Sequence, residues 1–291
     1  MVLSNKYHVL PFRYRLRFAF EDIHRLGRRL IGKAGELPDF IIIGAQKSGT
    51  TSLYQYLTGH PNILPALVKE VHFFDLNHHR GKDWYLSNFP YIQRHHSNAN
   101  RYICGESSPY YLFHPLVPKR MRELCPHVKL IVLLRNPVDR AVSHYHHMVQ
   151  RGLEKLSFID ALKEEGRRLE GEEARLIADP KYISAAHWHY SYLSRGLYAQ
   201  QLQRWFELFP KESLLILKAE DFFQETSSKL HEVCQFLGVS KWNFQIQEKH
   251  NVGSYRKVDE EAVRFLEDYY REPNRQLVEL LGSEFDWEKI G

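Results

Sequence analysis

Short apolar runs alternate along this chain with segments in which apolar residues recur every three or four positions. The runs lie at 40–43 (FIII), 71–74 (VHFF), 101–104 (RYIC), 129–134 (KLIVLL) and 214–217 (LLIL), and they predict strands. The periodic segments predict helices near 50–58, 116–124, 137–151, 157–169, 196–209, 226–237, 259–271 and 274–281. Because strands that alternate with helices form βαβ units, we expect an α/β fold of three layers, with a central, mostly parallel sheet flanked by helices.

The chain of 291 residues contains no internal repeat and no linker rich in Pro, Gly or Ser that would divide it. We expect two parts, a basic amphipathic N-terminal lead over residues 1–36 and one domain over residues 37–291. Within the lead, residues 6–33 combine many Arg and Lys with Phe, Leu and Ile at helical spacing, a pattern that can bind an anionic membrane surface. The alternative is a basic helix that packs on the domain and keeps its charged face in water.

Composition narrows the class of protein. A hydrophobic content of 43% can build a substantial core, and a formal net charge of +5 favours anionic ligands without specifying one. Cys104, Cys125 and Cys234 show no C-x-x-C spacing, so neither a disulfide framework nor a thiolate zinc site is indicated. No run of about 18 apolar residues predicts a membrane span, and no secretory apolar core opens the chain. We therefore expect a cytoplasmic protein.

The segment GAQKSGTT, residues 44–51, indicates a loop that binds an anion. It keeps the Gly-x-x-x-x-Gly skeleton of a P-loop, but Thr50 occupies the position where a nucleotide triphosphatase carries lysine, and the lysine lies inside the loop as Lys47. Glycine lets backbone N–H groups turn inward, and the start of the following helix favours negative charge. The sequence therefore predicts phosphate or sulfate binding in a P-loop-like fold.

A second motif, KLIVLLRNP, argues against a magnesium site. Enzymes that use a P-loop with magnesium commonly end such a strand in Asp, whereas this strand ends in Arg135. Asn136, Pro137 and Asp139 suit the cap, first and third positions of a helix, with Asp139 bonding back to the cap. Ser143 then lies two turns into that helix, where its hydroxyl could share an anion with Arg135. An arginine that bonds strand-end carbonyls beside a neutral helical serine is the alternative.

Three motifs in order, QKSGTTSL, KEVHFFD and RNPVDRAVSHYHH, resemble the sulfotransferases that use 3′-phosphoadenosine-5′-phosphosulfate (PAPS). The resemblance is strongest to the heparan sulfate 3-O- and N-sulfotransferase branch. It continues through WYLSNFP (84–90), GESSPYYL (105–112) and YYREPNRQLVELLGSEFDW (269–287), so it covers nearly everything from residue 38 on. It implies that residues 37–291 form a sulfotransferase domain, that PAPS is the donor and 3′,5′-ADP the product, and that no metal is required.

The resemblance also implies residue roles. Lys47 would neutralise charge on the departing bridging oxygen, Glu70 would be the base, and His72 would assist it. The implied donor-binding residues are Gln46, Lys47, Ser48, Gly49, Thr50, Thr51 and Ser52 at the 5′-phosphosulfate, Arg135 and Ser143 at the 3′-phosphate, and Tyr198, Gly253, Tyr255, Arg256 and Lys257 around the nucleotide. Of these, Gly253, Arg256 and Lys257 would be the equivalents of a Lys-Gly-Arg loop that closes over the nucleotide in the family, with a wider spacing than the family's.

The base and the acceptor stay open at this point. An acceptor hydroxyl is protonated at neutral pH, so transfer needs a base, and Glu70 and His72 would lie on one side of an alternating strand. The resemblance ranks Glu70 first, although cytosolic small-molecule sulfotransferases use a histidine. We expect a sugar-containing acceptor, a carbohydrate or glycolipid, with a small alcohol or phenol as the alternative. A P-loop kinase or nucleotide triphosphatase is a less favoured alternative. A nucleic-acid-binding protein is also less favoured, since no nucleic-acid module is recognised.

Overall fold

The computed structural model describes residues 25, 27, 35–92, 101–246 and 260–287. The strands are β1 (Phe40–Gly44), β2 (Ile63–Pro65), β3 (Ile103–Ser107), β4 (Lys129–Leu134) and β5 (Leu214–Lys218). The α-helices are α2 (Thr50–Thr58), α3 (Lys82–Leu86), α4 (Val117–Leu124), α5 (Pro137–Gln150), α6 (Phe158–Leu169), α7 (Glu172–Ala178), α8 (Ala185–His189), α9 (Tyr198–Phe206), α10 (Ala219–Gln224), α11 (Thr226–Leu237) and α12 (Glu260–Leu281). Short 3-10 turns lie at η2 (His78–Arg80), η4 (Ser194–Gly196), η5 (Lys211–Ser213) and η6 (Ser283–Phe285).

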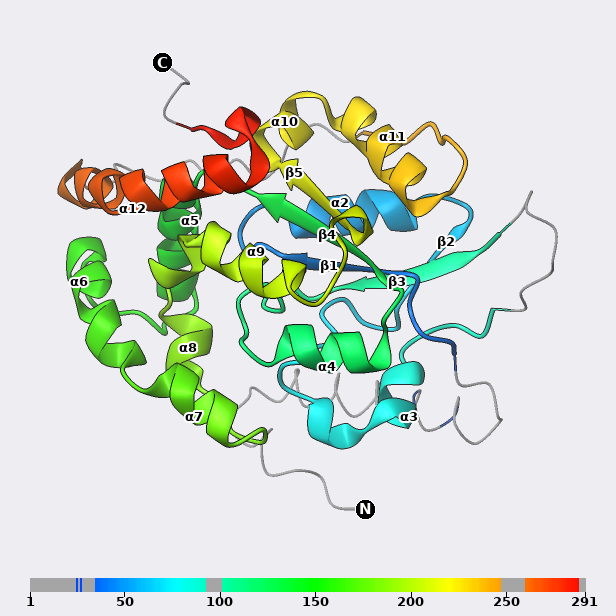
Figure 1. Cartoon of the computed structure of the whole chain (residues 1–291), viewed down its shortest axis with the longest axis horizontal. Coiled ribbons are helices and arrows are strands. Elements are labelled where there is room, and N and C mark those ends of the chain that lie inside the picture. Colours follow the sequence, from blue (N-terminus) through cyan, green and yellow to red (C-terminus); the bar gives the residue numbers. More distant parts are fainter. Residues whose placement is uncertain (1–24, 26, 28–34, 93–100, 247–259, 288–291) are drawn as a thin grey trace.

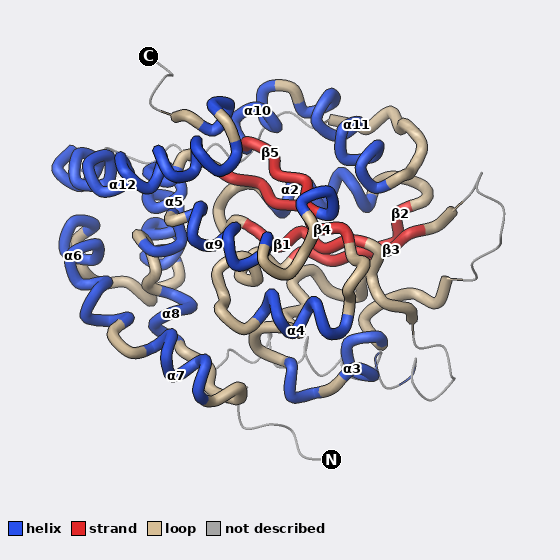
Figure 2. The backbone as a smooth tube through the Cα atoms, viewed as in Figure 1, coloured by secondary structure: helices blue, strands red, loops and turns tan. Residues whose placement is uncertain are grey.

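One parallel sheet forms the centre of the fold, with the strand order β2-β3-β1-β4-β5. Figures 1 and 2 show helices on both of its faces, α2 and α11 on one side and α4 and α9 on the other. Alternate residues of β1 enter the two cores: Ile41 packs with the core that includes α4 and α9, and Ile42 with the core that includes α2 and α11. A strand covered on both faces needs apolar residues throughout, which explains the unbroken FIII run. The expected three-layer α/β fold is confirmed.

A third cluster of buried side chains holds the helices at one end of the sheet together. Helices α5, α6 and α12 contribute to it, with Met148, Leu162 and Leu266 among its members. The two helices predicted at 259–271 and 274–281 are in fact the single helix α12, with Pro273 inside it. Leu266 and Leu277 lie in buried clusters on either side of the proline, so packing outweighs the loss of one helical hydrogen bond.

The strand predicted at 71–74 is wrong. These residues form an irregular segment with turns, and the edge strand beside β3 is β2, which the hydrophobic pattern missed. Glu70 has a φ of 65° and His72 a φ of 52°, both in the left-handed region, which an extended strand does not allow. Val71, Phe73 and Phe74 are apolar because their side chains enter the core, where the backbone turns rather than extends.

Little of the N-terminal lead is described. Arg25 is buried, donates from Nε to Asn88 Oδ1 at 2.8 Å, and stands over the Trp84 ring at 5.0 Å. This residue packs on the domain, whereas the rest of residues 6–33, apart from Gly27, lies outside the described residues. The predicted donor-binding residues Gly253, Tyr255, Arg256 and Lys257 also lie outside them. All three cysteines are buried and free.

Candidate active site

The loop between β1 and α2 has the form that the sequence predicts. Helix α2 begins at Thr50, and Gly49 precedes it in the left-handed conformation, with φ 95°. Gly49 has no side chain that could cap this helix, and the first turn contains no acidic residue, so among the described residues the backbone N–H groups at its start are available to an anion. A Cβ at Gly49 would lie 2.5 Å from Cζ of Phe223, which leaves room only for glycine.

Lys47 brings a cation into this loop. Burial lowers its pKa below the usual value, Arg135 and Arg140 lower it further by their charges, and Glu70 opposes them. Arg135 also donates from Nη1 to the carbonyl oxygen of Lys47 at 3.3 Å. Two side chains that repel each other are therefore held together beside the uncapped helix start, an arrangement suited to a ligand with more than one negative charge.

Helix α5 begins as predicted in one respect and differs in another. The side chain of Asn136 accepts a hydrogen bond from Val138 N at 2.9 Å, which confirms the cap. The predicted return bond from Asp139 is wrong, because the Asn136 N–H donates to Glu220 Oε1 at 2.8 Å. Asp139 instead lies 3.7 Å from Nη2 of Arg135.

A cleft of about 2470 Å³ joins most of the predicted residues that the structure describes, although His72 is not part of its lining. Those that line it are Gln46, Lys47, Gly49, Thr50, Thr51, Ser52, Glu70, Arg135 and Ser143. Ser48 and Tyr198 are buried behind it, and Tyr198 donates from Oη to the carbonyl oxygen of Arg135 at 2.9 Å. A direct contact of Tyr198 with a nucleotide stays a prediction. In this structure the Tyr198 hydroxyl supports the backbone of Arg135.

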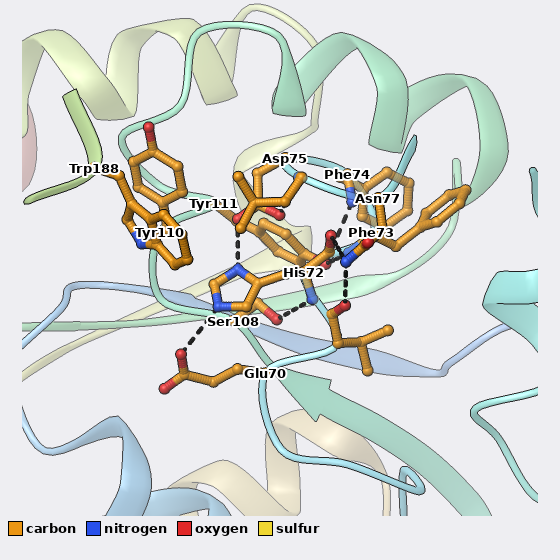
Figure 3. Close-up of polar contacts among 12 residues, drawn as sticks. Glu70, His72, Phe73, Phe74, Asp75, Asn77, Ser108, Tyr110, Tyr111 and Trp188 are labelled. Carbon is orange, nitrogen blue, oxygen red and sulfur yellow. Dashed lines mark hydrogen bonds and ion pairs between the residues drawn. The ribbon is translucent and has the colours of Figure 1, made fainter. Parts of the chain in front are cut away.

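Glu70 and His72 meet for a reason other than the one expected. They do not share the face of a strand, but lie on a tight loop whose left-handed residues turn both side chains to one side (Figure 3). Nε2 of His72 lies 3.1 Å from Oε2 of Glu70, and Nδ1 lies 2.7 Å from Oδ2 of Asp75. Lys69 Nζ holds the other oxygen of Glu70 at 3.0 Å. The sequence motif contained Asp75, but its part in this chain of contacts was not foreseen.

The charges of this group depend on one another. Burial disfavours charge on His72, but the Asp75 carboxylate and then Glu70 outweigh it and raise the pKa of His72 to about 10. Partial burial likewise disfavours charge on Glu70, whose side chain is 40% exposed, while hydrogen bonds and charges from His72 and Lys69 lower the pKa of Glu70 to about 2. His72 is therefore an imidazolium between two carboxylates at neutral pH, and Glu70 is ionised.

Sequence reasoning missed a buried arginine that supports the loop. Arg195 is 3% exposed, donates from Nη1 to Oε1 of Gln46, and is held by Ser191 Oγ at 2.7 Å and by the carbonyl oxygen of Trp188 at 2.7 Å. It also stands over the Tyr110 ring at 4.7 Å. The sequence gave no signal for its role, because Gln46 and Tyr110 lie far from Arg195 along the chain.

Comparison with known proteins identifies the family. The family model described as "Sulfotransferase domain" matches residues 37–270. The chain belongs to the sulfotransferase family. A solved sulfotransferase from Alicyclobacillus acidocaldarius superposes with a TM-score of 0.66 at 29% identity, covering 84% of this chain and 96% of that one.

Two relatives of this sulfotransferase carry heparan sulfate in their names. The human bifunctional heparan sulfate N-deacetylase/N-sulfotransferase 3 is 33% identical over 84% of this chain, which spans 30% of that protein's length. The human heparan sulfate glucosamine 3-O-sulfotransferase 6 is 28% identical, with 86% and 73% of the two chains covered. The membrane-associated sulfotransferase kil1 of Dictyostelium discoideum is 28% identical, with 88% and 68% covered. The predicted enzyme class and family are thereby confirmed.

One structural finding bears on whether this sulfotransferase could span a membrane. Among the helices that the structure describes, none combines the length and the apolar character that crossing a bilayer requires.

Proposed function

We propose that this sulfotransferase moves a sulfuryl group from PAPS to a hydroxyl of a sugar-containing acceptor, with Glu70 as the base. The observation that carries the proposal is the position of His72 between two carboxylates beside the cationic loop. The heparan sulfate relatives support the choice of a sugar, and amine transfer is the variant that an N-sulfotransferase would suggest. A carbohydrate and a glycolipid both offer a sugar hydroxyl of the kind that this proposal requires.

The residues around the cleft fit a donor with two separate anionic ends. Lys47 and the uncapped start of α2 suit the 5′-phosphosulfate, and Arg135 with Ser143 suits the 3′-phosphate. PAPS supplies the sulfuryl group and leaves as 3′,5′-ADP. Lys47 would stabilise the negative charge that develops on the bridging oxygen as the donor bond breaks. Since Arg135 places positive charge where magnesium enzymes place a carboxylate, we propose that transfer needs no metal.

Glu70 suits the role of base better than His72 does. Carboxylate oxygens only accept hydrogen bonds when ionised, so both ring nitrogens of His72 must donate and neither is free to take a proton. Glu70 is 40% exposed and lines the cleft, and its charge acts on that of Lys47. An acceptor hydroxyl that displaced one of the hydrogen bonds to Glu70 would raise its pKa and so strengthen it as a base.

The cleft also contains residues that suit a sugar. Trp188, His147, Gln150 and Arg151 are part of its lining. The Trp188 ring stands edge-on to His72, with ring centroids 5.7 Å apart. An aromatic face that covers the apolar side of a pyranose, surrounded by polar groups that bond its hydroxyls, is a common solution for such ligands.

The test compares Glu70→Gln with His72→Asn in a transfer assay with labelled, saturating PAPS. The acceptors offered are heparosan oligosaccharides, glycolipids, phenols and short alcohols. We expect Glu70→Gln to lower turnover about 10² to 10⁴-fold with 3′,5′-ADP affinity little changed, because it keeps the side-chain shape but removes the basic oxygen. His72→Asn should be milder. A small effect at Glu70 beside a collapse at His72 would reverse the assignment and favour a phenol or alcohol acceptor.

The proposals for the cellular location of the enzyme and for its domain boundaries come from the sequence. We propose that residues 1–36 form a basic lead before the sulfotransferase domain of residues 37–291, and that the enzyme works in the cytoplasm. Contact of residues 6–33 with an anionic membrane is part of the same proposal, and the relative named as membrane-associated supports it. Sedimentation of the enzyme with anionic vesicles, with and without residues 1–33, tests the contact. We propose no nucleic-acid partner.

A further inference from the structure

A fully buried carboxylate lies beneath the loop that carries Glu70 and His72. Glu106, near the end of β3, is 0% exposed and forms no ion pair with any described residue. Both of its oxygens accept hydrogen bonds from hydroxyls: Oε1 from Tyr85 at 2.8 Å and Tyr111 at 3.2 Å, and Oε2 from Ser108 at 2.7 Å. The mechanism proposed above gives this group no task.

Two of these hydroxyls also hold the backbone of the loop that carries Glu70 and His72, residues 70–77, which we call the catalytic loop. Ser108 Oγ accepts the N–H of His72 at 3.1 Å, and Tyr111 Oη accepts the N–H of Phe73 at 2.7 Å (Figure 3). A hydroxyl carries a single hydrogen, and here each hydrogen points to Glu106. The carboxylate thereby fixes the direction of both hydroxyls, so that their lone pairs face the two N–H groups of the loop.

The loop needs this support because its backbone is strained. Glu70 and His72 both adopt left-handed φ values, which side chains other than glycine disfavour and which persist only when their surroundings hold them. From the other side, Asn77 donates from Nδ2 to the carbonyl oxygens of Val71 at 3.3 Å and His72 at 3.0 Å. If the loop relaxed toward ordinary φ values, the His72 ring would leave its place between the two carboxylates.

We propose that Glu106 is a positioning residue for sulfuryl transfer, which acts through Ser108 and Tyr111 to fix the loop that joins Glu70 to His72. The inference rests on the proposed role of Glu70 as the base. Glu106 lies outside the cleft lining and does not touch the reacting groups.

Protonation of Glu106 should disturb this support. Burial is the main influence and raises its pKa to about 7, against the hydrogen bonds from Ser108 and Tyr85; the charge of Asp75 raises it and that of His72 lowers it. The neighbouring titratable groups that its charge influences in turn are Tyr54, Tyr85, Tyr111 and Cys125. A protonated carboxyl gains a donor and loses an acceptor, so one hydroxyl hydrogen is left without a partner.

Activity and stability should therefore respond to pH in opposite directions near neutrality. Turnover should fall as the pH drops below about 7, as Glu106 takes up a proton. Since the pKa of Glu106 is raised by folding from 4.5 to about 7, its contribution to stability is present below pH 4.5 and is lost as the pH rises through 7. A loss of turnover on mild acidification would thus not come from unfolding at this group.

The sharpest test is a matched pair of tyrosine variants. Tyr85 and Tyr111 are both fully buried and both donate to Oε1 of Glu106, but only Tyr111 accepts N–H groups of the catalytic loop. Tyr111→Phe should lower kcat roughly tenfold or more, with 3′,5′-ADP affinity unchanged, because a small misplacement of catalytic groups is costly. Amide hydrogen exchange in the peptide that contains residues 70–77 should accelerate. Both variants are assayed at pH 9, where Glu106 stays ionised; there Tyr85→Phe should leave kcat and this exchange unchanged.

A second variant tests the charge itself. Glu106→Gln should lower kcat and remove the fall in turnover below about pH 7, when labelled PAPS is saturating and the acceptor is the one with highest turnover in the screen above. The control is Glu172→Gln, which removes a buried carboxylate that also accepts from a tyrosine and a serine, Tyr182 at 2.8 Å and Ser184. It should leave the pH profile as in the wild type.

The outcomes separate this inference from the assignment of the base. Equal effects of Tyr85→Phe and Tyr111→Phe on kcat and exchange, or a Glu106→Gln profile that keeps its fall near pH 7, would overturn the role of Glu106. If Glu106→Gln does not fold, the tyrosine pair still decides. If Glu70→Gln keeps normal turnover while Tyr111→Phe loses it, the base assignment fails and the positioning of His72 by Glu106 stands.

Discussion

Replacing Asp75 by Asn would show how strongly the protein holds His72 in its charged form. The Asp75 side chain is fully buried, its Oδ2 lies 2.7 Å from Nδ1 of His72, and its Oδ1 accepts the N–H of Leu76 at 2.6 Å. Asparagine has nearly the same size and can still accept from Leu76, but it carries no charge. The substitution therefore removes the largest influence that keeps His72 protonated.

The magnitude follows from the pKa of His72, which rises from 6.5 to about 10. Each pKa unit corresponds to about 1.36 kcal/mol, so the two carboxylates favour the folded, protonated state by up to ~5 kcal/mol. Because the folded pKa is raised, this stabilisation is fully present below pH 6.5 and is lost as the pH rises through about 10. We expect Asp75→Asn to lower the free energy of unfolding by about 3 to 5 kcal/mol at pH 6, the usual cost of breaking a buried ion pair, and by clearly less at pH 10.

Two measurements check this expectation. Urea unfolding at pH 6, 8 and 10 gives the free energies, with Asp268→Asn as the control; that residue pairs with Arg271 at 2.6 Å on the surface, so its loss should change stability by only about 0 to 1 kcal/mol. NMR of the histidine side chains gives the pKa of His72, assigned by comparison with His72→Asn. In Asp75→Asn this pKa should fall by roughly 1 to 3.

The reasoning would be refuted by an Asp75→Asn protein that loses the same free energy at pH 6 and pH 10. It would also be refuted by a wild-type His72 that titrates near 6.5. Either result would mean that His72 is neutral between the carboxylates and is free to act as the base.

Two further predictions concern the donor site. Lys47→Ala should leave the fold intact, because the lysine faces the cleft rather than the core, and should raise the barrier by roughly 2.7 to 4 kcal/mol; turnover and thermal unfolding check this, and near-normal turnover would remove Lys47 from the mechanism. Arg135→Ala, and more weakly Ser143→Ala, should weaken 3′,5′-ADP binding by roughly tenfold or more while 5′-AMP binding changes little, since charge-assisted bonds contribute about 1.5 to 3 kcal/mol. Calorimetry that found equal losses for the two nucleotides would contradict contact with the 3′-phosphate.

The loop between β1 and α2 and the start of α5 were largely predictable because each lies within a short stretch of sequence. The unbroken apolar runs of β1 and β4 mark strands covered on both faces, and Gly49 marks the left-handed residue that lets α2 begin at Thr50. Asn136 capped the helix as expected for the same local reason. Each of these features depends on backbone conformation or burial over a few neighbouring residues.

The loop that carries Glu70 and His72 was less predictable. The alternation in KEVHFFD favoured a strand, yet the segment turns back on itself, because hydroxyls of Ser108 and Tyr111 and the side chain of Asn77 hold its N–H and carbonyl groups. Hydrophobic pattern records which side chains are buried and does not record which backbone path brings them there. The closeness of Glu70 and His72 was anticipated, but for the wrong geometric reason.

The sequence by itself determined the strands β1, β3, β4 and β5, the glycine loop between β1 and α2, and the family, since these are encoded in local patterns of residues. Only the tertiary structure decided that Asp75 makes His72 a cation, that Glu106 directs the hydroxyls below the loop, and that Arg195 reaches Gln46 from 149 positions away along the chain. These contacts join segments that the strand order β2-β3-β1-β4-β5 and the packing of helices bring together. Their charges and hydrogen bonds depend on burial and distance, which no single stretch of the sequence contains.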